Sequence, residues 1–209
     1  MDYSLARRAM IDSQLRPQAV TDVGVLAAMA STAREEYAPA ASRAFAYFDR
    51  PLPLAPGRSM MPPAALGRLL SELAPRAGDR ALVVGAGSGY SAALLGAIGC
   101  DVTAIEQDSA LAELARAAGI SLADGDPGEG FDLILIDGAV EQIPQSLVDR
   151  LVEGGRLGTA LIDRRDGSHS GVSRLVVGRA VAGRLGLATI TDAEVAPLPG
   201  YERPHAFTF

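Results

Sequence analysis

The chain has 209 residues, of which 48% are hydrophobic and 21% charged, so it has enough apolar material for a sizeable core. Its formal net charge of −6 disfavours a nucleic-acid partner, because a nucleic-acid-binding surface needs clustered positive charge. The chain contains no lysine, which excludes Schiff-base chemistry and a lysine general base.

The chain has one cysteine, Cys100, so neither an intramolecular disulfide nor a cysteine-rich zinc site is possible. No apolar run has the length of a signal-peptide core, and none approaches the roughly 18 residues that a membrane span needs. We therefore expect a cytoplasmic protein without a membrane partner.

Residues 1–75 are predicted to form helices and irregular segments. Apolar residues at helical spacing from Leu5 onward predict a first helix that Pro17 stops, and Asp22 is the expected N-cap of a second. The segment Phe45–Leu54 is too rich in proline for a central strand and too apolar for a solvated linker. We expect it to lie across the core or across a ligand.

Residues 76–209 are predicted to form an α/β core, because strands and helices alternate from Arg80. The expected strands are Arg80–Val84, Asp101–Glu106, Phe131–Ile136 and Gly155–Leu161. The expected helices are Gly89–Ala97, Ser109–Ala117 with a serine cap, and Ile143–Leu151. This alternation is typical of a parallel sheet covered on both faces.

The distal part of the chain is predicted to be rich in strands. Ser173–Val181 and Leu185–Ile190 flank a short turn, which indicates an antiparallel hairpin at the edge of the sheet, and Ala206–Phe209 is a further candidate strand. The closing segment from Pro197 to Pro204 is expected to pack against the sheet edge as an ordered tail.

A glycine loop, Gly85-Ala86-Gly87-Ser88-Gly89, directly follows the first predicted strand and opens a helix. Glycines there permit a tight turn and a close approach of the backbone to a nucleotide, beside the free N–H groups of a helix N-terminus. The nicotinamide-binding fingerprint needs a further glycine at position 90, where this chain has Tyr90. A nucleoside triphosphatase is also disfavoured, because no Lys-Ser/Thr pair follows the loop.

Acidic residues follow the next three strands. Glu106, with Gln107 after it, is placed to accept hydrogen bonds from the two ribose hydroxyls of an adenosine. Asp124-Gly125 is suited to the adenine amino group, and Asp137-Gly138 follows the apolar strand. Because the carboxyl ends of parallel strands form one crevice, these residues and the glycine loop are predicted to line one site, although solvated carboxylates are the plainer alternative.

An ordered set of residues resembles the protein-L-isoaspartate O-methyltransferase family over roughly residues 10 to 160. The set comprises Met10, Gln14-Leu15-Arg16, Asp22, Val25-Leu26, Ala28-Met29, Arg34-Glu35, Tyr37, Pro39, Ala46-Tyr47, Asp49, Pro51-Leu52-Pro53, Gly57, Pro63, Gly78-Asp79, Gly85–Tyr90, Glu106, Asp132 and Gly154-Gly155-Arg156-Leu157. Generic class I methyltransferases lack the N-terminal helices and the Pro-Leu-Pro segment.

The resemblance implies the class I S-adenosylmethionine-dependent methyltransferase fold. This fold is Rossmann-like, with a mixed seven-stranded sheet of order 3-2-1-4-5-7-6, and residues 1–75 form a helical cap over the cofactor. The implied activity is transfer of a methyl group from S-adenosylmethionine, which becomes S-adenosylhomocysteine, to an L-isoaspartyl carboxylate in a damaged protein substrate. That carboxylate has a pKa of about 4 and is already ionised at pH 7, so no general base is needed.

The acceptor side departs from the family. The family signature Thr-Ile-Ser-x-Pro, which engages the isoaspartyl group, is replaced here by Ser59-Met60-Met61-Pro62-Pro63. Met61 removes a hydroxyl donor, and losing one donor to a bound anion costs about 1.5–3 kcal/mol. Arg58 could compensate by pairing with a carboxylate, or it could point to solvent.

Two alternatives to isoaspartyl methylation stay open: a methyltransferase of the same lineage with another acceptor, and a non-catalytic S-adenosylmethionine-binding protein. Nucleobase N-methylation is disfavoured, because Asp137-Gly138-Ala139-Val140 stands in place of an Asn/Asp-Pro-Pro-aromatic motif.

No metal is expected, since Glu141 is the only further acid close to Asp137. His169 and His205 are expected at the surface.

Overall fold

The computed structural model describes residues 2–162 and 173–203 of the chain. Its central element is a sheet of strand order β4-β3-β5-β6-β7-β8. Strands β4, β3, β5 and β6 run parallel, and β7 and β8 are antiparallel additions at one edge. The strands are β3 Arg80–Val84, β4 Asp101–Ile105, β5 Phe131–Val140, β6 Leu151–Leu161, β7 Ser173–Val181 and β8 Arg184–Ala193.

The α/β class is confirmed, but the number and order of the strands differ from expectation. The sheet has six strands in the described part of the chain, because the expected third strand is reduced to one parallel bridge between Leu122 and Ala104. Four glycines with positive φ between positions 119 and 130 interrupt an extended backbone there.

The expected order places the last strand next to the fifth, whereas here β7 lies beside β6 and β8 forms the edge. The gap between Leu161 and Ser173 is short for a helical crossover to a parallel neighbour, which takes a dozen residues or more. The chain therefore returns as an antiparallel strand. The hairpin from β7 to β8 is confirmed, and its two turn residues have positive φ, 49° at Ala182 and 72° at Gly183.

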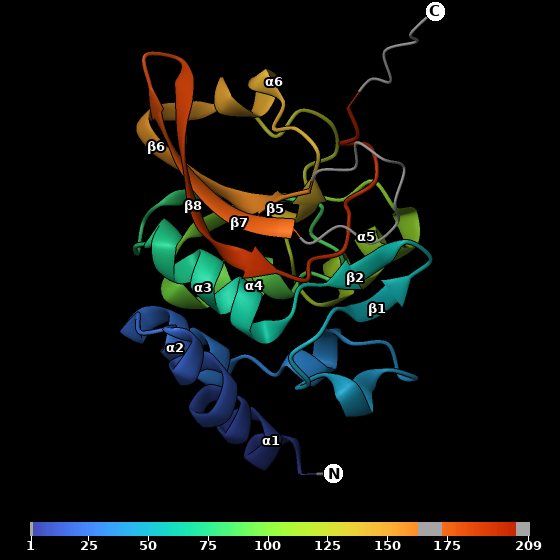
Figure 1. Ribbon diagram of the computed structural model, residues 1–209. Coiled ribbons are helices and arrows are strands. Elements are labelled where there is room, and N and C mark those ends of the chain that lie inside the picture. Colours follow the sequence, from blue (N-terminus) through green and yellow to red (C-terminus); the bar gives the residue numbers. More distant parts are fainter. Residues whose placement is uncertain (1, 163–172, 204–209) are drawn as a thin grey trace, which may run out of the picture.

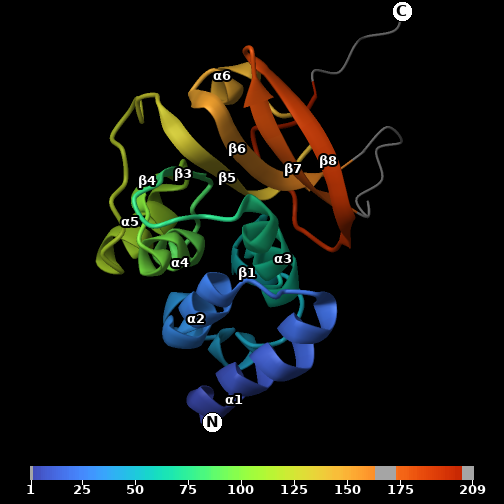
Figure 2. The same ribbon diagram turned by 90° about the vertical axis from the view of Figure 1, so that its left-hand side faces the viewer.

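Helices pack mainly against one face of the sheet (Figure 2). On this face lie α3 Pro63–Leu73, α4 Tyr90–Ile98 and α5 Ser109–Ala117, whereas the short α6 Gln145–Val148 lies on the other. The cap of α5 is Asp108 and not a serine, because the Asp108 carboxylate accepts from the backbone N–H groups of Ala110 and Leu111. The predicted helix Ile143–Leu151 is reduced to the four residues of α6, which begins after Pro144 and ends before β6 starts at Leu151.

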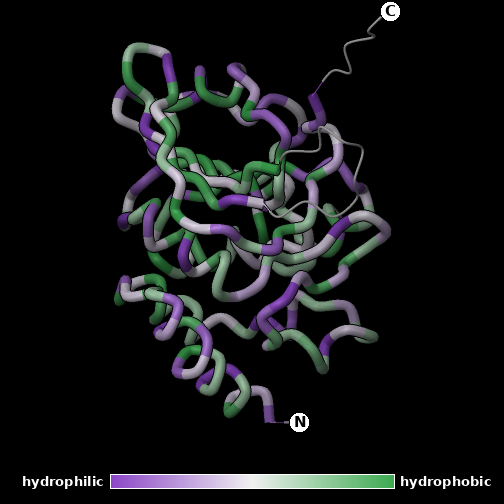
Figure 3. The backbone as a smooth tube through the Cα atoms, viewed as in Figure 1, coloured by the Kyte–Doolittle hydropathy of each residue, from purple (hydrophilic) through white to green (hydrophobic). Residues whose placement is uncertain are grey.

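Strand β5 divides the core in two by its alternating side chains. Leu133 and Leu135 join the cluster under α3 and α4, whereas Ile134 and Ile136 join a second cluster on the opposite face. That opposite face is covered by α6 and by Leu198 of the closing segment, so helical cover on both faces is less complete than the sequence predicts. Hydrophobic residues are concentrated along the central strands (Figure 3).

The N-terminal part lies beyond α3, on the side away from the sheet (Figures 1 and 2). It contains α1 Tyr3–Met10, a π-helical turn Ile11–Leu15, a 3-10 turn Arg16–Gln18 and α2 Val23–Ser31. Helical turns therefore continue through Pro17 to Gln18, whereas α1 itself ends at Met10. The Asp22 cap of α2 is confirmed, since its carboxylate accepts from the Val25 N–H at 2.8 Å.

Further 3-10 turns span Arg34–Tyr37 and Arg43–Phe45, and the proline-rich segment then leads into a separate two-stranded sheet. Strand β1, Leu52–Ala55, pairs there with β2, Arg58–Met60. This agrees with the prediction that the segment is no central strand.

No helix in the described ranges is both long and apolar enough to cross a membrane. His169, His205 and Ala206–Phe209 lie outside the described residues.

Helix α3 joins the N-terminal part to the sheet, so its buried face should dominate stability. Leu69 is fully buried, and Leu69→Ala should lower the free energy of unfolding by about 2–5 kcal/mol through lost burial and a cavity. The matched control is Leu114→Ala on α5, whose side chain is 50% exposed and which should change stability by well under 1 kcal/mol. Urea denaturation of both variants measures the difference, and equal losses would contradict this account of the core.

Candidate cofactor and acceptor site

The glycine loop lies at the carboxyl end of β3, where it crosses to α4. Gly85, Gly87 and Gly89 have φ of 71°, 58° and 96°, a backbone region that only glycine adopts readily. The N–H groups of Gly85 and Ala86 donate to the Ile105 carbonyl at 2.9 and 3.2 Å, which fixes the loop to the end of β4. The sequence prediction that this loop opens a helix is confirmed, because α4 begins at Tyr90.

Glu106 follows β4 and has a fully buried side chain. Its Oε1 accepts from Arg58 Nη1 at 2.6 Å and from the Asp108 N–H at 2.9 Å. Its Oε2 accepts from Arg58 Nη2 at 2.7 Å and from the Gly87 N–H at 2.7 Å. Burial raises the pKa of Glu106, but these hydrogen bonds outweigh burial and hold the pKa below its usual value.

Asp137 lies within β5, which continues to Val140 and does not end at Ile136 as predicted. The pairing register of β5 with β6 shifts between Leu135 and Ala139, and such irregularities redirect side chains beside functional sites. Asp137 Oδ2 accepts from the Ser91 hydroxyl at 2.5 Å. Burial raises the pKa of Asp137 to about 6, against the opposing effects of Ser91 and nearby arginines.

Four buried polar atoms around this point have no hydrogen-bond partner among the described residues. They are Ser88 Oγ, Tyr90 Oη, Asp137 Oδ1 and Arg34 Nη1, and their residues line one cavity of about 10 Å³ beside the glycine loop. Buried polar atoms without a partner are rare and costly, so each one calls for an explanation. A ligand that supplies both a cation and an anion would satisfy all four.

The predicted acceptor segment borders the same cavity. Ser59 and Met60 belong to β2 and Met61 follows it, and all three residues line the cavity opposite the glycine loop. Arg34 holds this segment in place, since its Nη2 donates to the Met61 carbonyl at 2.6 Å and its Nε to the Ala46 carbonyl at 2.7 Å. The structure therefore brings the predicted acceptor and cofactor residues together.

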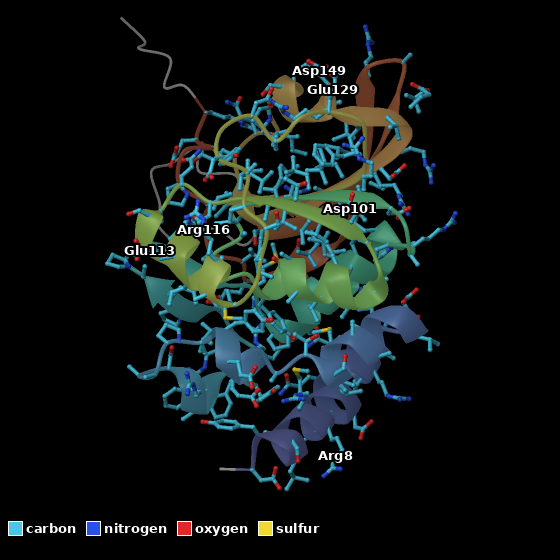
Figure 4. The ribbon with its side chains drawn as sticks, turned by 180° about the vertical axis from the view of Figure 1, so that it is seen from behind. Arg8, Asp101, Glu113, Arg116, Glu129 and Asp149 are labelled. Carbon is cyan, nitrogen blue, oxygen red and sulfur yellow. The ribbon has the colours of Figure 1, made fainter. Side chains whose placement is uncertain are left out.

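Two predicted cofactor residues lie apart from this cavity. The Asp124 carboxylate is 86% exposed and accepts from Arg116 at 2.7 Å. Arg116 belongs to α5 and is labelled in Figure 4. A methyl group built on Gly125 would meet no described atom within 4 Å, and neither Asp124 nor Gly125 lines either of the two small cavities among the described residues. Their role at the adenine amino group stays a prediction. Gln107 lines a second small cavity, of about 20 Å³, together with Glu106.

Sequence reasoning missed three features of the site. The buried position of Arg34 leaves no local signal, although Arg34-Glu35 contributes to the family resemblance. Arg58 does pair with a carboxylate, but that carboxylate is the chain's own Glu106. The closing segment does not pack at the sheet edge. Its Leu198 N–H donates to the Ala139 carbonyl at 2.8 Å, and Ala139 belongs to the inner strand β5.

No group of three or more potential metal ligands occurs in the ranges described.

The parallel sheet, the glycine loop and the acid after the second strand define the class I methyltransferase fold. Two solved structures show the same fold with TM-scores of 0.76. One, named protein-L-isoaspartate O-methyltransferase, is 18% identical, covering 93% of this chain and 66% of its own. The other, a beta-aspartate methyltransferase (PCMT) from Plasmodium falciparum in complex with S-adenosyl-L-homocysteine, is 17% identical and covers 95% of this chain and 98% of its own.

The sequence comparisons define the family. The model of the protein-L-isoaspartate(D-aspartate) O-methyltransferase family (PCMT) matches residues 6–166. A protein-L-isoaspartate O-methyltransferase of Koribacter versatilis is 38% identical over 211 residues, which cover 95% of this chain and 92% of that protein. The chain belongs to the protein-L-isoaspartate O-methyltransferase family.

The raised pKa of Asp137 predicts a pH-dependent effect of Asp137→Asn. The folded protein binds this proton more tightly than the unfolded chain, whose value is about 4, so the stability it contributes is complete below pH 4 and lost as the pH rises through about 6. The free energy of unfolding of the unmodified protein should therefore fall relative to the variant between pH 4 and 7, by up to about 3 kcal/mol. Denaturation across this range measures it. Asp101→Asn, at the exposed first residue of β4, is the control for loss of a carboxylate. A stability difference between Asp137→Asn and the unmodified protein that stays constant over this pH range would refute the prediction.

Proposed function

We propose that the chain methylates the free carboxylate of L-isoaspartyl residues in damaged proteins, with S-adenosylmethionine as methyl donor. The observation that carries this proposal is that the acceptor segment Ser59–Met61 and the glycine loop line one cavity in a member of this family. Cytoplasmic location and the absence of a nucleic-acid partner stay predictions.

The residues of the site suit the cofactor chemically. The Glu106 carboxylate suits ribose hydroxyls, which donate hydrogen bonds, and the Asp137 Oδ1 atom suits an ammonium group. The donors on Ser88, Tyr90 and Arg34 that have no acceptor among the described residues suit a carboxylate. S-adenosylmethionine carries all of these groups, and when bound it supplies an electrophilic methyl group on a sulfonium.

The chain's own task in the reaction is to position groups, not to transfer protons. The acceptor carboxylate is ionised at pH 7, so the site needs no general base. Ser59 offers a hydroxyl to orient that carboxylate, while the buried side chains of Met60 and Met61 exclude water from the cavity. In-line placement of the reacting atoms at about 3 Å is the main source of acceleration in such a site.

We further propose that residues 1–75 act as a substrate-side cap on the core of residues 76–209. Arg34 supports this division of labour, because it lies in the N-terminal part and fixes the Met61 carbonyl beside the core. Its guanidinium also lies over the Tyr90 ring, 4.8 Å from the centroid, so it ties the acceptor segment to the first turn of α4.

Met61 favours a second candidate function, methylation of a different carboxylate acceptor. The side chain is 2% exposed and offers a thioether where the family signature has a hydroxyl donor. A carboxylate that other donors of the site orient would not need a hydroxyl at position 61.

Labelled S-adenosylmethionine and matched isoaspartyl and aspartyl peptides distinguish these functions. Isoaspartyl methylation predicts base-labile label on the isoaspartyl peptide alone, because a carboxyl methyl ester is readily hydrolysed. Transfer to neither peptide by a folded protein that binds S-adenosylhomocysteine would contradict isoaspartyl methylation. It would leave the second candidate and the non-catalytic binding protein.

Restoring the missing donor should raise isoaspartyl activity. Met61→Ser is expected to increase kcat/KM for the isoaspartyl peptide by about tenfold or more, since a donor to an anion contributes about 1.5–3 kcal/mol. Met60→Ser is the matched control, because Met60 is also buried at this cavity and loses the same volume on substitution. Equal rates for the two variants, measured well below their unfolding temperatures, would mean that the hydroxyl at position 61 does not reach the acceptor.

A further inference from the structure

Two leucines from distant segments cover the glycine loop. A methyl group built on Gly85 would lie 2.7 Å from Leu198 Cδ1, and one built on Gly138 would lie 2.8 Å from Leu198 Cβ. A methyl group on Gly87 would lie 2.9 Å from Leu54 Cδ1. The leucine side chains therefore rest directly on the loop backbone, on the surface that a nucleotide would have to contact.

Arg58 blocks Glu106, the carboxylate proposed to receive the ribose hydroxyls, as the two leucines block the glycine loop. Both guanidinium nitrogens of its fork donate to the two oxygens of Glu106, at 2.6 and 2.7 Å, and Nη2 also lies 3.2 Å from the Gly85 carbonyl. The two side chains are only 10% and 0% exposed. Backbone N–H groups of Gly87 and Asp108 take the remaining positions on the carboxylate, so no position is left for two ribose hydroxyls.

Little space remains between these side chains. The cavity at Glu106 has a volume of about 20 Å³ and the cavity at Asp137 about 10 Å³. A site for a ligand of the size of S-adenosylmethionine has a volume of about 300 Å³ or more. The side-chain chemistry therefore fits the cofactor, but the arrangement of Arg58, Leu54 and Leu198 leaves no room for it.

We propose that Arg58 is an internal competitor of the cofactor, a latch that closes the nucleoside site by pairing with Glu106. This inference rests on the proposed function, because it assumes that Glu106 receives the ribose. The cofactor enters when its hydroxyls replace the Arg58 guanidinium on Glu106, and Leu54 and Leu198 leave the glycine loop in the same movement.

The local structure permits such an exchange. Arg58 and Leu54 belong to the β1–β2 hairpin, which forms its own sheet apart from the main one (Figure 1). The hairpin can therefore shift without breaking a hydrogen bond of the main sheet. Leu198 lies in the closing segment, which is bonded to β5 from the Ala139 N–H to Ala196 at 2.9 Å and from the Leu198 N–H to Ala139 at 2.8 Å. The Leu198 side chain must therefore leave the glycine loop by a change of rotamer or by breaking these two bonds.

The latch predicts that removing the Arg58 charge strengthens cofactor binding. The apparent dissociation constant equals the intrinsic one divided by the fraction of open molecules, so a site that is closed nine-tenths of the time binds about tenfold more weakly. Calorimetry should show that Arg58→Gln and Arg58→Ala bind S-adenosylhomocysteine at least tenfold more tightly than the unmodified chain. Arg50→Gln is the matched control: Arg50 is an exposed arginine of the same segment that lies over Phe48, and its substitution should leave the affinity unchanged.

The latch is overturned if both Arg58 variants bind S-adenosylhomocysteine no more tightly than the unmodified chain does. Circular dichroism must show that both variants are folded. If the Arg58 variants do not fold, Leu198→Ala decides, because it uncovers Gly85 without removing a charge. Tighter binding by that variant supports closure, and unchanged binding overturns it.

The latch and the proposed function can fail separately. Isoaspartyl methylation by the unmodified chain, together with unchanged affinity in the Arg58 variants, keeps the function and removes the latch. The opposite result is that the Arg58 variants bind S-adenosylhomocysteine more tightly, but neither they nor the unmodified chain methylates the isoaspartyl peptide. That result supports the latch and contradicts the proposed isoaspartyl methylation. Absence of binding by every folded variant overturns both.

Discussion

The buried carboxylate of Glu106 is the interaction on which the site depends. A buried charge is stable only when hydrogen bonds replace its lost hydration, and Glu106 obtains four of them. They come from the glycine loop, from the start of the turn before α5, and from Arg58 on the β1–β2 hairpin. One carboxylate thus fixes three segments that are far apart in the chain, and the acceptor residues after Arg58 are placed as a consequence.

The Glu106 carboxylate can bind either the Arg58 guanidinium or the ribose hydroxyls, but not both at once. In pairing with Arg58 it stabilises the folded chain, whereas in binding a ribose it serves the reaction. Asp137 shows a related conflict between stability and binding. One of its buried oxygens has no hydrogen-bond partner in the part of the chain that the structure describes, and its pKa is raised to about 6. Such unsatisfied or exchangeable polar groups are expected at functional sites, where stability is reduced in favour of binding.

Local patterns in the sequence predicted the parts of the fold that local physics determines. The apolar run Arg80–Val84, the helix Ser109–Ala117 and the hairpin strand Ser173–Val181 have the predicted bounds, and Asp22 caps its helix. The glycine loop was recognisable because positive φ selects glycine.

The missed features depend on contacts between residues distant in sequence. Arg58 and Glu106 are 48 positions apart, and nothing near either residue indicates that they pair. Leu198 covers Gly85 from the closing segment, and the shifted register at Asp137 arises from pairing with β6. The strand order, with β7 beside β6 and β8 at the edge, depends on pairing between separate strands and has no signal within either strand.

A crystal structure of the chain with S-adenosylhomocysteine tests the exchange of partners at Glu106. We predict ribose hydroxyls within hydrogen-bond distance of the Glu106 carboxylate and the Arg58 guanidinium displaced from it. A nucleoside bound elsewhere, with the Arg58–Glu106 pair intact, would rule out this exchange.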